Sequence, residues 1–169
     1  WRKRHRSIYY YQVRRERVGE TDQWVWVPRG APTKQDTFHR SKKAIRVISG
    51  GNRSGKSTGG INEDVAHSLG DRPWLEPSDP DYKVQIRIPN KGLICGEAFG
   101  EQVKKTIIPK LLGDPEKGIP GAIPSEELAF TKKNPAGIIT EVGFKNWSVI
   151  FLQSYDQEVD LFESADYDW

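Results

Sequence analysis

The stretch that decides the fold is Gly50-Gly51-Asn52-Arg53-Ser54-Gly55-Lys56-Ser57. It matches, without a mismatch, a phosphate-loop pattern in which four variable residues separate two glycines, and a lysine and a serine follow. The β-branched run 44–49 predicts a strand before the loop, and the residues from Lys56 to a stop at Gly70 predict a helix after it. Strand, glycine loop and helix together are the setting in which this pattern holds the phosphates of a nucleotide.

The residue types in the loop suit triphosphate chemistry. Glycines let backbone N–H groups turn toward phosphate oxygens, and the start of the following helix adds the positive end of its dipole. Lys56 is predicted to reach the β and γ phosphates of ATP, and Ser57 is predicted to ligate Mg²⁺. The predicted nucleotide-binding residues of the loop are Gly50, Gly51, Asn52, Arg53, Ser54, Gly55, Lys56 and Ser57.

Arg53 is an unusual residue inside such a loop, and its chemistry allows two interpretations. Its guanidinium has the reach to lie near the γ phosphate and to stabilise the charge that develops as the bond breaks, which makes it a catalytic candidate beside Lys56. In the second interpretation, Arg53 faces solvent or pairs with a carboxylate. The residues alone leave both open.

The rest of the chain alternates strand and helix patterns, which predicts an α/β fold. A buried strand is expected at 91–96 and a helix at 101–112. The runs 137–144 and 147–152 predict a hairpin. A stretch rich in proline lies between the first helix and these elements, and it is expected to be a surface excursion with one edge strand at 83–88.

Two regions are expected in the chain. Residues 1–31 are interpreted as a basic and aromatic N-terminal extension, with a short strand at 24–27, and residues 32–169 as part of a phosphate-loop ATPase domain. Near the end of the sequence, residues 156–162 predict one or two helical turns, and residues 165–169 are expected to enter a strand.

Charge is distributed unevenly along the chain, although the net charge is only +3. Residues 1–46 contain 13 Lys or Arg against four acids, whereas residues 155–169 contain six acids and no Lys or Arg. A basic segment such as Arg2-Lys3-Arg4-His5-Arg6 can release counterions from a phosphate backbone, which is the electrostatic mark of nucleic-acid binding. The alternative is a solvated, charged tail.

Several classes of protein do not fit the composition. Cys95 is the only cysteine, which excludes an internal disulfide and a cysteine-rich zinc site and fits a reducing compartment. No run approaches the roughly 18 apolar residues that a membrane span needs. A soluble intracellular protein is therefore expected. The chain begins at Trp1 and has no methionine, so either the natural N-terminus is absent or the sequence omits modified residues such as selenomethionine.

A hydrolytic ATPase also needs a carboxylate at the end of a second apolar strand to hold Mg²⁺, and a glutamate that polarises the attacking water. The sequence has no such pair after four apolar residues. Asp166 and Asp168 follow Glu163-Ser164-Ala165 instead, so they are interpreted as the approach to such a strand.

Two parts of the sequence carry a family resemblance. The run Gln35-Asp36-Thr37-Phe38-His39-Arg40-Ser41, followed by the glycine-asparagine-arginine loop, resembles the large terminase subunit of tailed bacteriophages and prophages. The segments 151–155 and 162–169 resemble the lead-in to the Walker B strand of that family. The resemblance covers about residues 32 to 169.

The resemblance implies an ATPase of the additional-strand phosphate-loop class, with a mostly parallel sheet, that pumps double-stranded DNA through a portal into an empty capsid. It implies ATP and Mg²⁺ as cofactors. The implied partners are double-stranded DNA, a small terminase subunit, a portal and further copies of the chain, in the host cytoplasm and away from membranes. Gln35 corresponds to an adenine-contacting glutamine, although a polar loop residue is the alternative, and Arg53 corresponds to a phosphate-sensing basic residue.

In that family the Walker B aspartate, catalytic glutamate, coupling motif and nuclease domain would all lie past Trp169. The chain is therefore expected to stop before the Walker B strand is complete and to hydrolyse ATP poorly. Two other functions remain open on the sequence. One is a helicase-like or recombination ATPase, and the other is a non-catalytic nucleotide-binding module.

Overall fold

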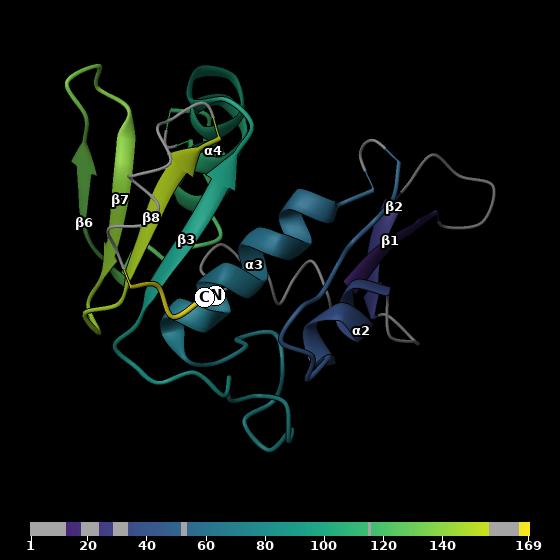
Figure 1. Cartoon of the computed structure of the whole chain (residues 1–169). Coiled ribbons are helices and arrows are strands. Elements are labelled where there is room, and N and C mark those ends of the chain that lie inside the picture. The colour runs from purple at the N-terminus through teal and green to yellow at the C-terminus, as the bar shows by residue number, and fades with distance from the viewer. Residues whose placement is uncertain (1–12, 18–23, 29–33, 52–53, 115, 156–165) are drawn as a thin grey trace.

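A computed structural model of this chain describes residues 13–17, 24–28, 34–51, 54–114, 116–155 and 166–169 (Figure 1). Its helices are α2 (Lys34–Arg40), α3 (Lys56–Leu69), the π-helix η1 (Phe99–Ile107) and α4 (Ile108–Leu112). Its strands are β1 (Val13–Arg17), β2 (Trp24–Pro28), β3 (Lys91–Gly96), β4 (Gly113–Asp114), β5 (Ile119–Pro120), β6 (Leu128–Lys133), β7 (Ile139–Phe144) and β8 (Val149–Ser154). None of these described helices is long and apolar enough to cross a membrane.

The main sheet has four described strands in the order β3-β8-β7-β6, and it is mixed. β3 and β8 pair in parallel, whereas β7 pairs antiparallel with both β8 and β6. Short connections join β6 to β7 and β7 to β8, and such connections allow only antiparallel neighbours. The expected α/β class is confirmed, but the expectation of a mostly parallel sheet is wrong for the described strands.

The hydrophobic core lies between one face of this sheet and three helices. In β8, alternate residues Ile150, Leu152 and Ser154 are buried, as the two-residue period of a strand requires. Ile150 and Leu152 pack in one hydrophobic cluster with Val65 of α3 and Leu111 of α4. Figure 1 shows α3 between the sheet and α2, so α3 joins the core to the N-terminal part of the domain.

Most predicted elements are present. The helix after the loop is α3, which ends at Gly70 in the left-handed region (φ 85°). The strand expected at 91–96 is β3, although only its two glycines are buried and the rest is half-buried or exposed. The hairpin is β7–β8, and the short N-terminal strand is β2. The helix expected at 101–112 is divided into η1 and α4, because the first part bonds five residues back, with Val103 N–H donating to Ala98 O at 3.2 Å.

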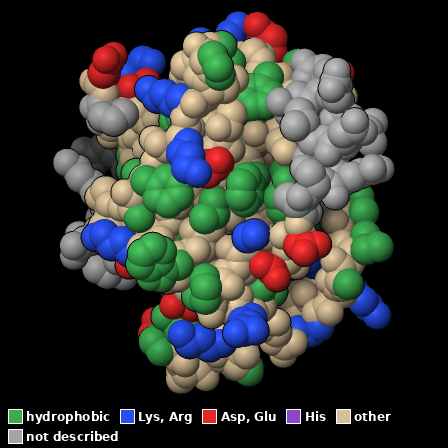
Figure 2. All heavy atoms as spheres, turned by 60° about the vertical axis from the view of Figure 1, so that its left-hand side comes forward, with side chains coloured by type: hydrophobic (Ala, Val, Ile, Leu, Met, Phe, Trp, Pro, Cys, Tyr) green, Lys and Arg blue, Asp and Glu red, His purple; other side chains and the backbone are tan. Residues whose placement is uncertain are grey.

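Other expectations fail or lie outside the described residues. The edge strand at 83–88 does not form; Lys83 makes only an isolated bridge with Asp71. The helical turns expected at 156–162 lie in a part of the chain that the structure does not describe. β6 is not predicted by the sequence patterns, and it is an outer strand with mostly exposed side chains. Figure 2 shows the side of the molecule where β6 lies, with hydrophobic side chains interspersed among both signs of charge.

The strand predicted at 44–49 is the main correction. This segment has no strand pairing, and Ile45 and Val47 are 87% and 86% exposed. Neither edge of β3 is free to pair with this segment, because one edge pairs with β8 and the other bonds to the end of the described chain. There Asp168 N–H donates to Lys91 O at 2.7 Å, and Leu93 N–H donates to Trp169 O at 3.1 Å. These bonds run in the parallel sense, as expected of a segment entering a strand, although no strand is assigned there.

The segment is held instead by an ion cluster around Glu63 of α3, which is 2% exposed. We call Glu63, His39, Arg46, His67 and Arg72 the Glu63 cluster. Glu63 Oε1 accepts hydrogen bonds from Arg46 Nη1 and Arg72 Nη2, both at 2.7 Å, and lies 3.2 Å from His67 Nε2. His39 Nδ1 lies 2.7 Å from Oε2. One carboxylate thus joins α2, the segment 44–49, α3 and the chain after it.

The electrostatic balance at Glu63 follows from these contacts. Burial raises the pKa of Glu63, but the hydrogen bonds from His39, His67, Arg72 and Arg46 overcome this effect and hold the pKa far below its ordinary value of 4.5. The fold therefore favours the ionised form of Glu63, which partly neutralises two guanidinium groups.

We predict that Glu63→Gln destabilises the fold by about 3 kcal/mol or more, because it leaves the buried guanidinium group of Arg72 and the largely covered one of Arg46 without a counter-charge. The matched control is Glu101→Gln, which breaks the exposed pair between Glu101 and Lys105 on η1 and should cost less than about 1 kcal/mol. Urea unfolding measures both. Equal destabilisation in the two variants would contradict the role given to Glu63.

The same carboxylate predicts a pH dependence. The pKa of Glu63 is lower in the folded than in the unfolded state, so its stabilisation is complete above about pH 4.5 and is lost as the pH falls from there toward the folded pKa. The stability gap between the wild type and Glu63→Gln should then shrink by up to about 1.4 kcal/mol per pH unit below pH 4.5. A gap that stays constant between pH 6 and pH 3 would refute this.

Candidate functional site: the phosphate loop

The predicted phosphate loop leads into α3 with an open helix start. Gly55 has φ 85° and ψ 9°, in the left-handed region that favours glycine, and it immediately precedes the first helical residue, Lys56. No side chain caps this end of α3. The first helix bond is donated by Gly59 N–H to Gly55 O at 2.8 Å. For the earlier N–H groups of the first turn no acceptor is found among the described residues, and with the positive end of the helix dipole these groups suit an anion.

Lys56 lies across the loop. Its Nζ donates hydrogen bonds to Gly50 O at 2.6 Å and to Gly51 O at 2.8 Å. These carbonyl oxygens hold the ammonium group at the loop, where phosphate oxygens are stronger acceptors for it. A Cβ atom at Gly50 would lie 2.9 Å from Ser54 Oγ, so a larger residue at Gly50 would displace Ser54.

Ser57 lies in the first turn of α3, and it is exposed. A serine hydroxyl in this position fits one coordination site of Mg²⁺, whose remaining ligands in such sites are phosphate oxygens, water and a carboxylate. Within the described part of the chain, no group of three or more His, Cys, Asp or Glu residues could hold a metal ion. Ser57 is the residue that the sequence analysis predicted as a metal ligand, and that role stays a prediction.

Gln35 reaches the loop from α2. Its Nε2 donates a hydrogen bond to Ser54 O at 3.3 Å, although the two residues are 19 positions apart in sequence. A glutamine at this place can meet a nucleotide whose phosphates lie in the loop. The structure therefore brings Gln35 next to Ser54, in the same loop whose Gly50 and Gly51 carbonyl groups accept hydrogen bonds from Lys56.

Two predicted site residues lie outside the described residues. They are Asn52 and Arg53, so neither interpretation of Arg53 is tested by the geometry. Asp168 lies away from the loop. Its carboxylate accepts a hydrogen bond from Lys91 N–H at 2.7 Å, beside β3.

Sequence reasoning missed the Glu63 cluster, which fixes the position of α3 and hence of the loop. Part of it was visible in advance, because Glu63 and His67 are four residues apart and therefore share one face of the helix. His39 was noted only as part of a family motif. The approach of Arg46 and Arg72 to the same carboxylate depends on tertiary structure, and no local pattern indicates it.

Comparisons with protein-family models, with curated proteins and with solved structures found no match to this chain.

Proposed function

We propose that this chain binds ATP through residues 50–57 and is the nucleotide-binding part of a large terminase subunit, the motor ATPase that drives double-stranded DNA into a phage capsid. The fold would then be a phosphate-loop ATPase domain of the additional-strand class. The observation that carries the proposal is the uncapped start of α3, directly after Gly55 in the left-handed region and with Lys56 held at the mouth of the loop.

Each loop residue has a defined part in this function. The first N–H groups of α3 would surround the phosphates, while Lys56 would exchange its two carbonyl acceptors for oxygens of the β and γ phosphates. Ser57 would give one ligand to the Mg²⁺ that accompanies ATP. Gln35, which bonds to the loop in the structure, would contact the adenine ring.

The same proposal assigns Arg53 to the γ phosphate, by family resemblance, and double-stranded DNA to the basic N-terminal segment. The small terminase subunit, the portal, other copies of the chain and the host cytoplasm belong to the proposal as well. The resemblance of residues 35–41 and 50–57 to the terminase family supports these assignments.

We predict that Lys56→Ala weakens ATP binding at least about tenfold, because it removes the cation that meets the β and γ phosphates. Isothermal calorimetry measures the affinity directly. Lys105→Ala is the matched control, since it removes an exposed lysine on η1 with the same change of charge. Unchanged affinity in Lys56→Ala, with the protein folded, would reject the phosphate-loop assignment.

DNA binding by the N-terminal segment is tested by changing Arg2, Lys3, Arg4 and Arg6 to Gln. Deleting residues 1–46 would also remove His39 and Arg46 from the Glu63 cluster, so substitution is the cleaner experiment. We predict that the plot of log affinity for duplex DNA against log salt concentration becomes shallower by about 0.9 for each phosphate that the variant no longer neutralises. The same slope before and after substitution would exclude this segment as a DNA-binding element.

A further inference from the structure

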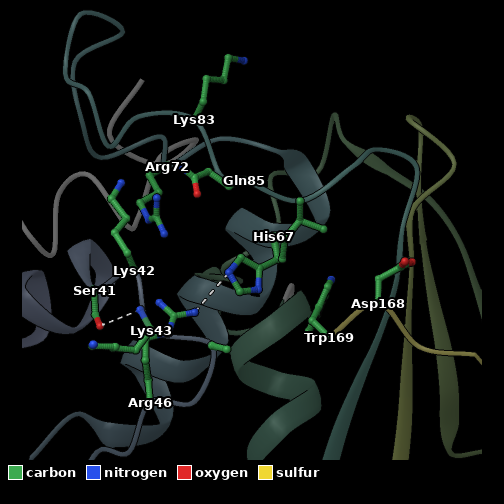
Figure 3. A pocket seen from close by; sticks show the side chains of 12 residues that line it. Ser41, Lys42, Lys43, Arg46, His67, Arg72, Lys83, Gln85, Asp168 and Trp169 are labelled. Carbon is green, nitrogen blue, oxygen red and sulfur yellow. Dashed lines mark hydrogen bonds between the residues drawn. The ribbon is translucent and has the colours of Figure 1, made fainter.

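A second concave site lies at the opposite end of α3 from the phosphate loop (Figure 3). Its volume is about 360 Å³, within the range of small-ligand sites. His67, which lines it, is 11 residues beyond Lys56 along the helix, which corresponds to about 16 Å. The walls come from the segment 41–46, the loop at 83–86 and residues 168–169. This cavity is therefore separate from the proposed nucleotide site.

Positive side chains from separate parts of the chain line the cavity and its rim. Arg46 and Arg72 belong to the Glu63 cluster and are nearly buried, with side chains 15% and 7% exposed. The lysines that line the cavity, Lys42, Lys43 and Lys83, are exposed, and Figure 3 shows the Lys43 and Lys83 side chains extending outward from its rim. Fixed guanidinium groups thus lie in the cavity wall, and movable ammonium groups lie at its rim.

The carboxylates near these groups do not neutralise all of them. Glu63 serves both Arg46 and Arg72, and Asp81 pairs with Lys42 but also with Arg40. Lys83 has only a long contact of 3.8 Å, to Asp71. For Lys43 no ion pair is found among the described residues, and its side chain is exposed. The five Lys and Arg residues exceed Glu63, Asp71, Asp81 and the lining Asp168 by one charge.

Arg46 also has an N–H donor that is not used within the described fold. Arg46 uses its two Nη atoms for Glu63, His67 and Phe38, and its Nε–H has no acceptor among the described residues. The geometry of Arg46 is fixed by these bonds. An anion in the cavity would therefore meet a group that is already oriented, which lowers the entropy cost of binding.

The opposite wall is partly apolar. Trp169 lines it with Ile86, and the indole is held by a hydrogen bond from its Nε1 to Asn90 Oδ1 at 3.1 Å and by an edge contact with His67, with ring centroids 5.4 Å apart. A ligand that places an anionic group at the arginines and a less polar group toward Trp169 would match both walls.

We propose that this cavity is a binding site for a phosphate ester, separate from the phosphate loop. The phosphate oxygens lie against the guanidinium group of Arg46, and Lys43 and Lys83 at the rim add positive charge. The sugar or other group esterified to the phosphate lies toward Trp169. Guanidinium and ammonium groups together are the donors that proteins use for phosphate. A free sugar phosphate and a phosphodiester of a nucleic-acid strand present the same chemistry to this site.

The experiment uses the full chain carrying Lys56→Ala, so that the phosphate loop does not contribute. Ribose 5-phosphate and the dinucleotide thymidylyl-thymidine, which has one phosphodiester, are titrated separately at low salt. The signal is the indole N–H resonance of Trp169 in a proton–nitrogen correlation spectrum, assigned with Trp169→Phe. We expect saturable shifts, and the tighter probe identifies the source of the phosphate ester.

The double variant Lys43→Gln/Lys83→Gln should weaken binding of the tighter probe about tenfold, because it removes two exposed charges at the cavity. The matched control, Lys105→Gln/Lys145→Gln, removes two exposed lysines elsewhere and should leave that affinity unchanged. The proposal is overturned if neither probe shifts the Trp169 signal saturably, or if both double variants bind equally. In an otherwise wild-type chain, Lys43→Gln/Lys83→Gln should leave the affinity for ATP unchanged. The proposal for this cavity is therefore tested independently of the proposal for the phosphate loop.

Discussion

The arrangement of this molecule depends on one buried carboxylate, that of Glu63. Its two oxygens meet groups from four separate parts of the chain, and without them α2 and the segment 44–49 would have few contacts with α3. Hydrophobic packing holds α3 against the sheet, whereas ionic hydrogen bonds hold the N-terminal side of the domain against α3. The Glu63 cluster therefore determines where Gln35 lies relative to the predicted phosphate loop.

Local patterns predicted the elements whose stabilisation is local or periodic. α3 has a glycine at each end, and β7 and β8 are neighbours in sequence that pair through a tight turn. Local sequence patterns were therefore sufficient to predict these elements. The run 44–49 shows the limit of this reasoning. Its β-branched residues favour a strand, but a strand also needs a free edge, and β3 offers its edge to Asp168 and Trp169 instead. Which edge is free is a property of the whole fold.

The candidate site was predictable to a similar degree. The spacing of Gly50, Gly55, Lys56 and Ser57 indicated the loop, and the structure adds the open helix start and the contact of Gln35. The second cavity had no counterpart in the sequence patterns, because its charges come from positions 42 to 83 that no motif connects. α3 contributes to both places, with Lys56 at its first residue and His67 near its last, so one helix links the two sites at which we propose anion binding.

The exposed segment 44–49 has a consequence for handling the protein at high concentration. Ile45 and Val47 are accessible, and the backbone beside them makes no strand pairing within the described fold. Such a stretch is a template for intermolecular β-pairing and aggregation. Lys42 and Lys43 stand directly before it, and Arg46 interrupts it, so two copies that approached through this segment would bring like charges together. Repulsion between the positive charges of Lys42, Lys43 and Arg46 on two copies therefore opposes aggregation through this segment. High salt would screen this repulsion and favour aggregation.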